Sequence, residues 1–280
     1  MADCPVVVLS MWRFPMSPAR SGAGGGNVLP DAYVRSVLTK YELPSGEGSP
    51  AERVAVELRK PIGEWAGRYL LGVTFCGSYA NGTRVKGSTD LDLLISLGPR
   101  TPIDIDKLYE RFFAFLKMRD YNPKRESVSI GLQHHGLAVD LVPAKQEWGA
   151  SNDYRIFETE RRRIIRTNFD THQKTVKESD FIEEIRLLKI WRNLRNLRFP
   201  SFCLGLTVID ALRHTAHHQP AKNLQTVLEY LRDVFVNAPI RDPANFDNRV
   251  SDDLLKHEKL AIADAATSSL RAADWSLIVK

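Results

Sequence analysis

Three aspartates in apolar surroundings are the residues of this sequence best suited to chemistry. Asp90 and Asp92 begin an apolar stretch that runs to residue 97, and Asp140 interrupts a second such stretch at 137–142. Because side chains alternate along a strand, Asp90 and Asp92 project from one face while the apolar side chains between and after them face a core. The sequence therefore predicts carboxylates gathered on one face of a sheet.

Carboxylates placed side by side repel one another unless something compensates. At about 4 Å and an effective dielectric of about 20, the repulsion is on the order of 4 kcal/mol. Either one acid is protonated, with a raised pKa, or a cation lies between them. Carboxylate oxygens suit Mg²⁺, and two such ions would lower the pKa of an attacking hydroxyl and neutralise charge on a triphosphate. The competing interpretation is that these acids cap turns or pair with basic residues at a solvated sheet edge.

A Gly-Ser pair ahead of the aspartates favours the metal site. A predicted strand runs into Gly77-Ser78, where the chain must turn tightly and a short helix is expected to begin. Such a turn presents backbone N–H groups and the positive end of the helix dipole to an anion. The Ser78 hydroxyl adds a donor without blocking a phosphate. The turn and the aspartates together predict a site for a metal-bound phosphate.

Hydrophobic spacing indicates the elements that position these residues. Strands are expected at 71–76 and 91–97 and in a hairpin of 128–132 with 137–142. Helices are expected at 29–41, 51–68, 102–119, 178–197, 201–214, 221–236 and 252–273. Pro61 is expected to break or kink the second of these helices near Lys60, and no strand is expected beyond Pro143. The pattern predicts an α+β fold, a mixed α/β lobe followed by a helical lobe.

The predicted domain organisation follows from this order. Residues 1–28 are expected to be a flexible leader, because 19–27 is glycine-rich and almost without apolar side chains. Residues 29–150 are expected to form the catalytic core, a small mixed β-sheet with helices that include the N-terminal ones. Residues 151–280 are expected to form a helical lobe that completes a nucleotide cleft.

The composition is that of a globular protein, with 43% hydrophobic and 26% charged residues among 280. The apolar runs are too short to span a bilayer, and the N-terminus lacks the pattern of a secretory signal. Three cysteines are too few and too scattered for a disulfide framework or a zinc knuckle. We therefore expect a cytoplasmic protein with no membrane partner. The net charge of +5 agrees with a nucleotide or nucleic-acid partner, although many mildly basic proteins bind neither.

With these motifs in view, the sequence resembles the polymerase-beta-type nucleotidyltransferase superfamily. The Gly77-Ser78 turn, the pair Asp90 and Asp92, and the later strand aspartate Asp140 carry the likeness. More narrowly, the chain resembles the branch that holds oligoadenylate synthetase, cyclic GMP–AMP synthase and the bacterial cyclic-oligonucleotide synthases of anti-phage defence. The narrower likeness rests on residues 166–172, 184–191, 199–202 and 242–245, and it covers about residues 50–250.

The resemblance implies a two-lobed nucleotidyltransferase fold and a role for each aspartate. Asp90 and Asp92 would bind two Mg²⁺ ions, which Mn²⁺ could replace. Asp140 would bind the ion that activates the acceptor hydroxyl. The implied reaction joins a nucleotidyl group from an NTP to a ribose hydroxyl and releases pyrophosphate.

The resemblance also implies contacts with the donor nucleotide. Gly77, Ser78, Lys189 and Ser201 would hold the triphosphate, and Phe202 would stack on the base. From the residues alone, Lys189 can bury its stem and extend its ammonium into a cleft. Ser201 could equally cap the following helix, and Phe202 could equally be a core residue.

The product implied by the resemblance is a cyclic di- or trinucleotide second messenger, used in anti-phage signalling and read by an effector protein. Two alternatives share the fold: an enzyme that adds nucleotides to RNA, and one that nucleotidylates a protein or a small molecule. A third is a catalytically silent module that binds nucleic acid, against which the presence of all three aspartates argues.

Other patterns are better explained without a ligand. Residues 82–88 have the glycine spacing of a P-loop but no lysine after the second glycine. The remaining candidates are His214, His217 and His218 with Asp210; His134 and His135; Arg161, Arg162, Arg163 and Arg166; and Cys76 and Cys203. The first group could bind a metal, but a satisfied or solvated helix face is the simpler explanation. The arginines could follow a nucleic-acid backbone, but a charged helix face is the simpler explanation. The histidine pair is expected to be exposed at a hairpin turn, and the cysteines to be packed thiols.

Overall fold

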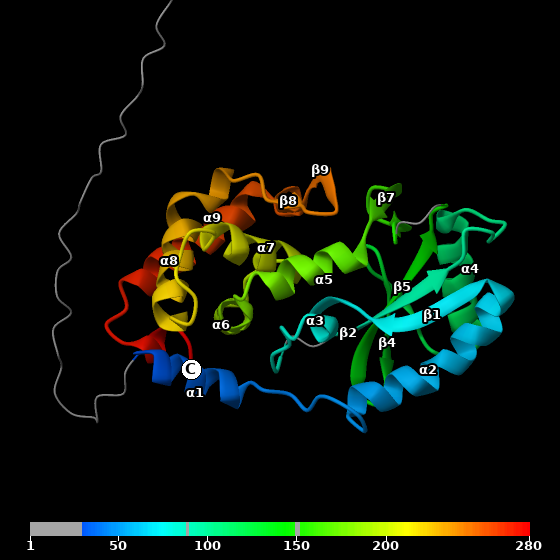
Figure 1. Cartoon of the computed structure of the whole chain (residues 1–280), viewed down its shortest axis with the longest axis horizontal. Helices are drawn as coiled ribbons and strands as arrows, with labels where there is room; N and C mark the ends of the chain where they lie inside the picture. The colour runs from blue at the N-terminus through cyan, green and yellow to red at the C-terminus, as the bar shows by residue number, and fades with distance from the viewer. Residues whose placement is uncertain (1–29, 88–89, 149–151) are drawn as a thin grey trace, which may run out of the picture.

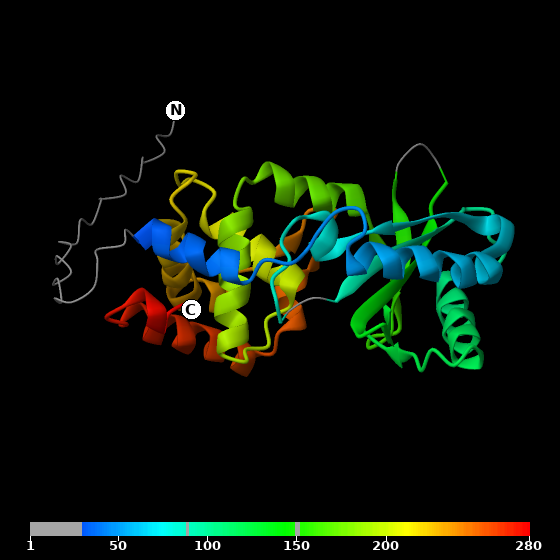
Figure 2. The same cartoon turned by 90° about the horizontal axis from the view of Figure 1, so that it is seen from below.

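The computed structural model describes residues 30–87, 90–148 and 152–280, and the predicted leader, 1–28, lies outside the described residues. A β-sheet with two helices against it forms one side of the molecule, and most of the other helices form the other side (Figure 1). Figure 2 shows both sides from below. The order of elements, a mixed sheet followed by helices, confirms the predicted α+β fold class. None of the described helices has the length and apolar character that crossing a membrane requires.

Seven strands form the main sheet. They are β1 (Leu70–Phe75), β2 (Leu91–Leu97), β3 (Lys124–Arg125), β4 (Ile130–His134), β5 (Leu137–Gln146), β6 (Tyr154–Glu158) and β7 (Arg163–Thr167). The order is β1-β2-β5-β4-β3, and the β6–β7 hairpin pairs with the end of β5. β2 and β5 are parallel, and the other pairs are antiparallel. Parallel neighbours need a crossover connection, which contains α4 (Ile105–Met118).

The face of the sheet that carries the leucines of β2 is covered by α2 (Pro50–Ala66) and α4. Leu91, Leu93 and Ile95 are buried in one apolar cluster with residues of both helices. The intervening side chains of β2 project from the opposite face, as the period of two predicts. The aspartates are therefore on the face that the two helices leave open.

Helix α2 passes through Pro61 without a break, so of the predicted break or kink near Lys60 the break is wrong. A proline removes one helical hydrogen bond and crowds the preceding turn. Leu58 and Ile62, on either side of it, are both buried against the sheet. Burial of this apolar face outweighs the local cost of the proline, since each fully buried aliphatic side chain contributes about 1.5–3 kcal/mol.

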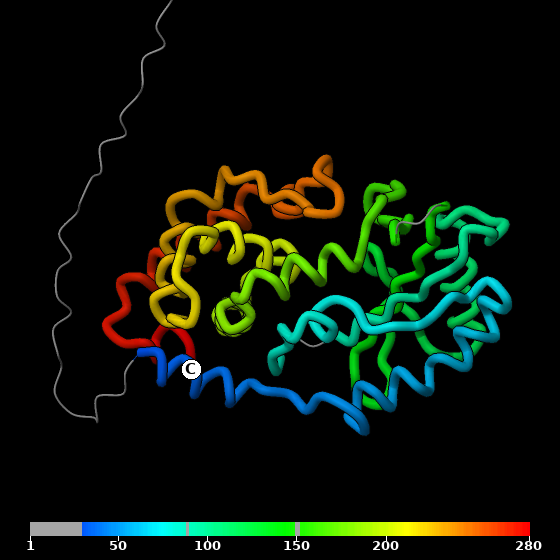
Figure 3. The backbone as a smooth tube through the Cα atoms, viewed as in Figure 1, coloured from blue at the N-terminus to red at the C-terminus, as the bar shows by residue number. Residues whose placement is uncertain are grey.

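The helical side contains most of the remaining helices. They are α5 (Phe169–Glu178), α6 (Ile182–Leu194), α7 (Ser201–Ala211), α8 (Pro220–Asp233) and α9 (Lys256–Leu270). α1 (Pro30–Lys40) packs with them, because Val34, Val37 and Leu38 share a buried cluster with residues of α6 and α8. Figure 3 follows the chain from α1 across to α2 beside the sheet. The predicted domain boundary near residue 150 stays a prediction.

Strand pairing continues beyond Pro143, contrary to prediction. β5 runs on to Gln146, β6 and β7 follow it, and β8 (Arg241–Asp242) pairs with β9 (Asn245–Arg249). These strands are short and rich in charged residues, so their sequences lack the apolar alternation that marks a strand. Arg163 and Arg166 consequently lie on β7, and the predicted charged helix face is wrong for them.

The other differences concern where helices end. The predicted helix at 178–197 is interrupted, since Glu178 ends α5 and Ile182 begins α6. α7 ends at Ala211, so His214, His217 and His218 lie beyond it and lack the predicted helical spacing. The short elements are α3 (Gly77–Ala80) and the 3₁₀ turns Gly67–Tyr69, Phe235–Asn237, Val250–Asp253 and Trp275–Leu277. Cys76 and Cys203 are buried free thiols, as predicted.

The core beneath the sheet gives a test of this packing. Phe112 on α4 is 0% exposed, and its ring centroid lies 4.2 Å from that of Trp65 on α2. We expect Phe112→Ala to lower the free energy of unfolding by about 3–5 kcal/mol, because it leaves a cavity between two helices and the sheet. Urea denaturation measures the loss. Met118→Ala on the same helix is the matched control, since Met118 is 76% exposed, and equal losses in both variants would contradict the packing.

Candidate functional site

The site begins where β1 ends and the chain turns into α3 at Gly77. Gly77 has φ of 55°, and a Cβ at this position would lie 2.2 Å from Oδ2 of Asp92. Only glycine therefore allows the backbone to approach the Asp92 carboxylate this closely. The backbone N–H of Ser78 donates a hydrogen bond to the same carboxylate. The Gly-Ser turn and the aspartate strand are thus in direct contact.

Two of the three aspartates lie opposite each other on neighbouring strands. Asp92 on β2 is in register with Asp140 on the parallel strand β5. Burial and the charge of Asp140 raise the pKa of Asp92 to about 7, and the hydrogen bond from Ser78 opposes the rise. Burial and the charge of Asp90 raise the pKa of Asp140 to about 6. Asp90, just before β2, is exposed, and the structure brings all three charges within electrostatic reach of one another.

A fourth carboxylate, which the sequence did not indicate, lies beside Asp140. The charge of Glu126 contributes to the raised pKa of Asp140, and the Ser129 hydroxyl donates a hydrogen bond to Asp140. Gly131 faces Asp140 across the β4–β5 pair, and a Cβ there would lie 3.2–3.3 Å from Glu126 and Asp140 atoms. Glu126 precedes β4 in a segment without apolar alternation, so only the folded chain shows its position.

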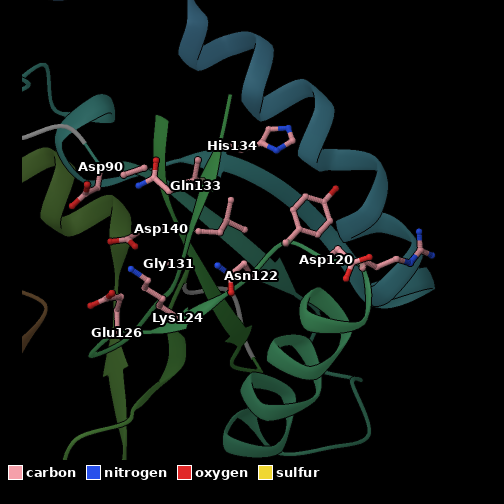
Figure 4. Close-up of a pocket in the computed structure, with 14 residues that line it drawn as sticks. Asp90, Asp120, Asn122, Lys124, Glu126, Gly131, Gln133, His134 and Asp140 are labelled. Atoms are coloured by element: carbon pink, nitrogen blue, oxygen red, sulfur yellow. The ribbon is translucent and has the colours of Figure 1, made fainter. Parts of the chain in front are cut away.

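Asp90, Asp140 and Glu126 line one cavity of about 640 Å³, which we name the acidic cavity. Figure 4 shows these three carboxylates along one side of it, with Lys124 nearby and Gln133 close to Asp90. Its size falls within the range of about 300–1,000 Å³ that is typical of small-molecule sites. The acidic cavity is therefore large enough for a nucleotide.

A second cavity, of about 560 Å³, lies on the other side of Asp92, and we name it the cleft cavity. Its lining comes from both sides of the molecule, with Gly77 and Asp92 from the sheet side, His172 from α5 and Phe202 from α7. The rings of His172 and Phe202 have centroids 4.5 Å apart. An aromatic side chain in such a wall can stack on a planar ligand.

The far wall of the cleft cavity is fixed by contacts between segments distant in sequence. Nε2 of His172 lies 2.7 Å from Oδ1 of Asp242, a residue only 2% exposed. The Asn245 side-chain amide donates to the Arg166 carbonyl oxygen at 3.1 Å. The segments 166–172 and 242–245, which the sequence resemblance singled out separately, are thus joined in one place.

Two of the predicted phosphate contacts, Lys189 and Ser201, form hydrogen bonds with other residues of the protein. Lys189 is 2% exposed, and its Nζ donates to the carbonyl oxygen of Thr83 at 3.1 Å and to its Oγ1 at 3.2 Å. Burial and the nearby charge of Arg192 lower the pKa of Lys189 to about 8, and Asp92 opposes this shift. Ser201 begins α7, and its Oγ accepts a hydrogen bond from Arg192 at 3.0 Å. Lys189 and Ser201 line neither of the two cavities.

The donor set of the aspartates fits a hard divalent cation. Carboxylate oxygens are the protein ligands that Mg²⁺ and Mn²⁺ prefer, and a cation would offset the repulsion that raises the pKa of Asp92 and of Asp140. In the part of the chain that the structure describes, the oxygens of the three aspartates do not all lie within 4.8 Å of one another. For the three aspartates to bind the same ion, a side chain must therefore rotate, and the exposed Asp90 can do so most easily.

The close approach at Gly77 gives a stability test. We expect Gly77→Ala to cost about 2–4 kcal/mol of unfolding free energy, because the added methyl group collides with the Asp92 carboxylate and alanine is strained at this φ. Urea denaturation measures the cost. Gly82→Ala is the matched control, because Gly82 has φ of 69° but nothing within 4 Å of an added Cβ. A loss at Gly77 no larger than that at Gly82 would contradict the contact.

The raised pKa of Asp92 predicts how stability depends on pH. The folded protein binds a proton at Asp92 up to about pH 7, whereas the unfolded chain releases it near pH 4. This carboxyl therefore makes unfolding easier as the pH rises from about 4 to about 7. In EDTA at pH 8 we expect Asp92→Asn to raise the free energy of unfolding by about 2 kcal/mol.

The gain of Asp92→Asn should disappear towards pH 4, where the wild-type carboxyl is protonated in both states. Chemical denaturation at both pH values, with EDTA present so that no cation offsets the repulsion, measures it. Asp264→Asn, at an exposed position on α9, is the control and should show no such change. A gain of equal size at both pH values would count against the shifted pKa.

Comparison with known proteins shows which solved structures share this fold. No protein-family model matches the chain, and no curated protein matches it in sequence. Among solved structures, CdnC of E. coli MS115-1 in its complex with HORMA-deltaN matches with a TM-score of 0.72 and 20% identity, covering 90% of this chain and 93% of that one. The CD-NTase CdnG of Bradyrhizobium diazoefficiens, solved with GTP, has a TM-score of 0.70 and 16% identity over 89% and 92%.

A poly(U) polymerase also matches. The Cid1 poly(U) polymerase, solved with Mg and 3′-dATP bound, has a TM-score of 0.60 and 12% identity, covering 86% of this chain and 93% of that one. Identities this low establish a shared fold. The chain has the polymerase-beta nucleotidyltransferase fold, in the form seen in bacterial CD-NTases and in Cid1 poly(U) polymerase.

Proposed function

We propose that this chain is a metal-dependent nucleotidyltransferase that joins NTPs into a cyclic di- or trinucleotide. The observation that carries the proposal is the placement of Asp92 opposite Asp140 on parallel strands, directly below the Gly77 turn. Holding like charges close together lowers the stability of the fold, and the raised pKa values that result are typical of functional sites. A purely structural role would not explain why the fold keeps a cluster that lowers its stability.

The three aspartates have distinct parts in this proposal. Asp90 and Asp92 would hold two Mg²⁺ ions, and Asp140 would hold the ion on the acceptor side. Bound Mg²⁺ would lower the pKa of the attacking ribose hydroxyl and neutralise charge on the leaving pyrophosphate. Glu126, on the acidic cavity beside Asp140, would accept a hydrogen bond from an incoming hydroxyl and orient it.

The donor triphosphate would lie at the Gly77 turn. Backbone N–H groups there and the Ser78 hydroxyl would donate to phosphate oxygens. Lys189 would take part only by giving up its bonds to Thr83, and phosphate oxygens are the stronger acceptors because they are charged. Ser201 would donate its hydroxyl hydrogen to phosphate while its oxygen still accepts from Arg192.

The base of one nucleotide would enter the cleft cavity. Phe202 and His172 supply aromatic rings on its wall, and stacking on such rings tolerates any base. Asp242, which accepts from both the Ala244 N–H and His172, would fix the orientation of the histidine ring. The acidic cavity would receive the second nucleotide, whose hydroxyl must reach Asp140.

The match to CdnE of Elizabethkingia meningoseptica, a cyclic dinucleotide synthase solved with GTP and Apcpp, supports a cyclic product over extension of RNA, with a TM-score of 0.67 against 0.60 for Cid1. The likeness to CdnC and CdnG covers about nine-tenths of every chain compared, with TM-scores of 0.72 and 0.70 against 0.60 for Cid1. CdnC was also solved with ATP and CdnG with GTP. Nucleotide addition to RNA is the second candidate, because Cid1 shares the fold. A second-messenger role in anti-phage defence, with an effector protein as the reader, follows the sequence resemblance.

Product analysis tests the proposal. We expect the tag-free protein, incubated with each labelled NTP and with all four together in Mg²⁺ or Mn²⁺, to release pyrophosphate and form a product that resists phosphatase. Asp90→Ala combined with Asp92→Ala should lower product formation by at least about 10³-fold, because the metal ligands are lost. Asp264→Ala, on the exposed surface of α9, is the matched control and should retain activity.

The same assay separates the alternatives. Label that moves onto added RNA would replace the cyclic product with nucleotide addition, and label on a protein band would indicate target nucleotidylation. Full activity in the double aspartate variant would contradict the assigned metal ligands. A protein that neither binds Mg²⁺-NTP nor releases pyrophosphate under any condition would favour the silent nucleic-acid-binding module.

A further inference from the structure

Two histidines at the β4–β5 turn and a glutamate on α2 form a compact cluster. Nε2 of His134 lies 3.0 Å from Oε2 of Glu57, and Nε2 of His135 lies 2.7 Å from the same oxygen. Candidate ligand atoms of the three side chains all lie within 4.8 Å of one another. The expected exposure of the pair is confirmed for His135, but the His134 side chain is only 20% exposed.

The backbone at the turn explains how neighbouring histidines face the same partner. Along a strand, adjacent side chains point to opposite faces. His135 has φ of 48°, a left-handed conformation that is uncommon for residues other than glycine. The two ring centroids are consequently 4.3 Å apart, and both rings reach Glu57.

We infer that Glu57, His134 and His135 form a second metal site, for a borderline divalent transition-metal ion such as Zn²⁺. Two imidazole nitrogens and a carboxylate oxygen, completed by water, make a four-coordinate site that Zn²⁺ accepts. Bond lengths of about 2.0–2.2 Å at tetrahedral angles place ligand atoms roughly 3.3–3.6 Å apart, so the contacts of 3.0 and 2.7 Å to Glu57 must open by roughly 0.3–0.9 Å. Two imidazole ligands select against Mg²⁺.

The cluster borders the acidic cavity, which His134 lines together with Asp90 and Asp140, but its ligands are not the aspartates and it does not rest on the proposed nucleotidyl transfer. Figure 4 shows His134 beside α2 and apart from the carboxylates of Asp90 and Asp140. A bound ion would tie α2 to the β4–β5 hairpin. Since β5 also carries Asp140, the ion would stabilise the strand pair next to the acidic cavity.

Metal titration of the full, tag-free chain tests this inference. The protein is stripped with EDTA, desalted and titrated with Zn²⁺ and with Co²⁺, in a background of Asp90→Asn, Asp92→Asn and Asp140→Asn so that the aspartates bind no ion. We expect one ion per chain with a dissociation constant on the order of micromolar, and a visible Co²⁺ absorption typical of four-coordinate geometry. At a hundredfold excess over that constant, the melting temperature should rise by roughly 5 °C.

Variants assign the ligands. His135→Ala and Glu57→Gln should each weaken Zn²⁺ binding by at least about tenfold, and both are surface changes that leave the core intact. His214→Ala, at an exposed histidine outside the cluster, is the matched control and should bind as tightly as its parent. Zn²⁺ affinity that is unchanged in both cluster variants, or no stoichiometric binding by the parent, would overturn the inference.

Discussion

The structure depends on holding two carboxylates close together at a partly buried position. Asp92 and Asp140 lie opposite each other on parallel strands, and their pKa values of about 7 and about 6 show the cost of that placement. A flexible loop would relieve such repulsion by moving apart. Central strands cannot, because the hydrogen bonds of the sheet and the apolar core beneath it fix their register. The free energy needed to hold the acids therefore comes from the buried face of the sheet.

The rest of the fold surrounds this pair with surfaces of two kinds. The sheet side supplies the Gly77 turn and the acidic cavity. The helical side supplies the wall of the cleft cavity, where His172, Phe202 and Asp242 come from three separate elements. Binding in the cleft cavity must therefore depend on how the two sides meet. Lys189 connects the two sides, because its side chain extends from α6 and donates a hydrogen bond to the carbonyl oxygen of Thr83, which follows the Gly77 turn.

Local signals in the sequence failed where long-range packing or pairing was stronger. Pro61 is a helix breaker by its own chemistry, yet the buried face of α2 keeps the helix continuous. The strands β6 and β7 after Pro143 lack apolar alternation, and they form because β6 pairs with the end of β5 and β7 pairs with β6. α1 precedes the sheet in sequence but packs with the C-terminal helices. In each case the deciding partner is far away along the chain, so no window of sequence contains it.

The sequence by itself determined the α+β class, the main strands and the three aspartates, because period-two alternation and a Gly-Ser turn are local properties. It also indicated that Asp90 and Asp92 share a face, which the strand period requires, whereas Asp140 joins them through the register of β5 with β2. Only the tertiary structure decided that Glu126 joins Asp140, that His172 meets Asp242, and that Glu57 approaches the histidines of the β4–β5 turn. The reason is that such contacts depend on register and crossover, which are set when distant segments bury their apolar faces together.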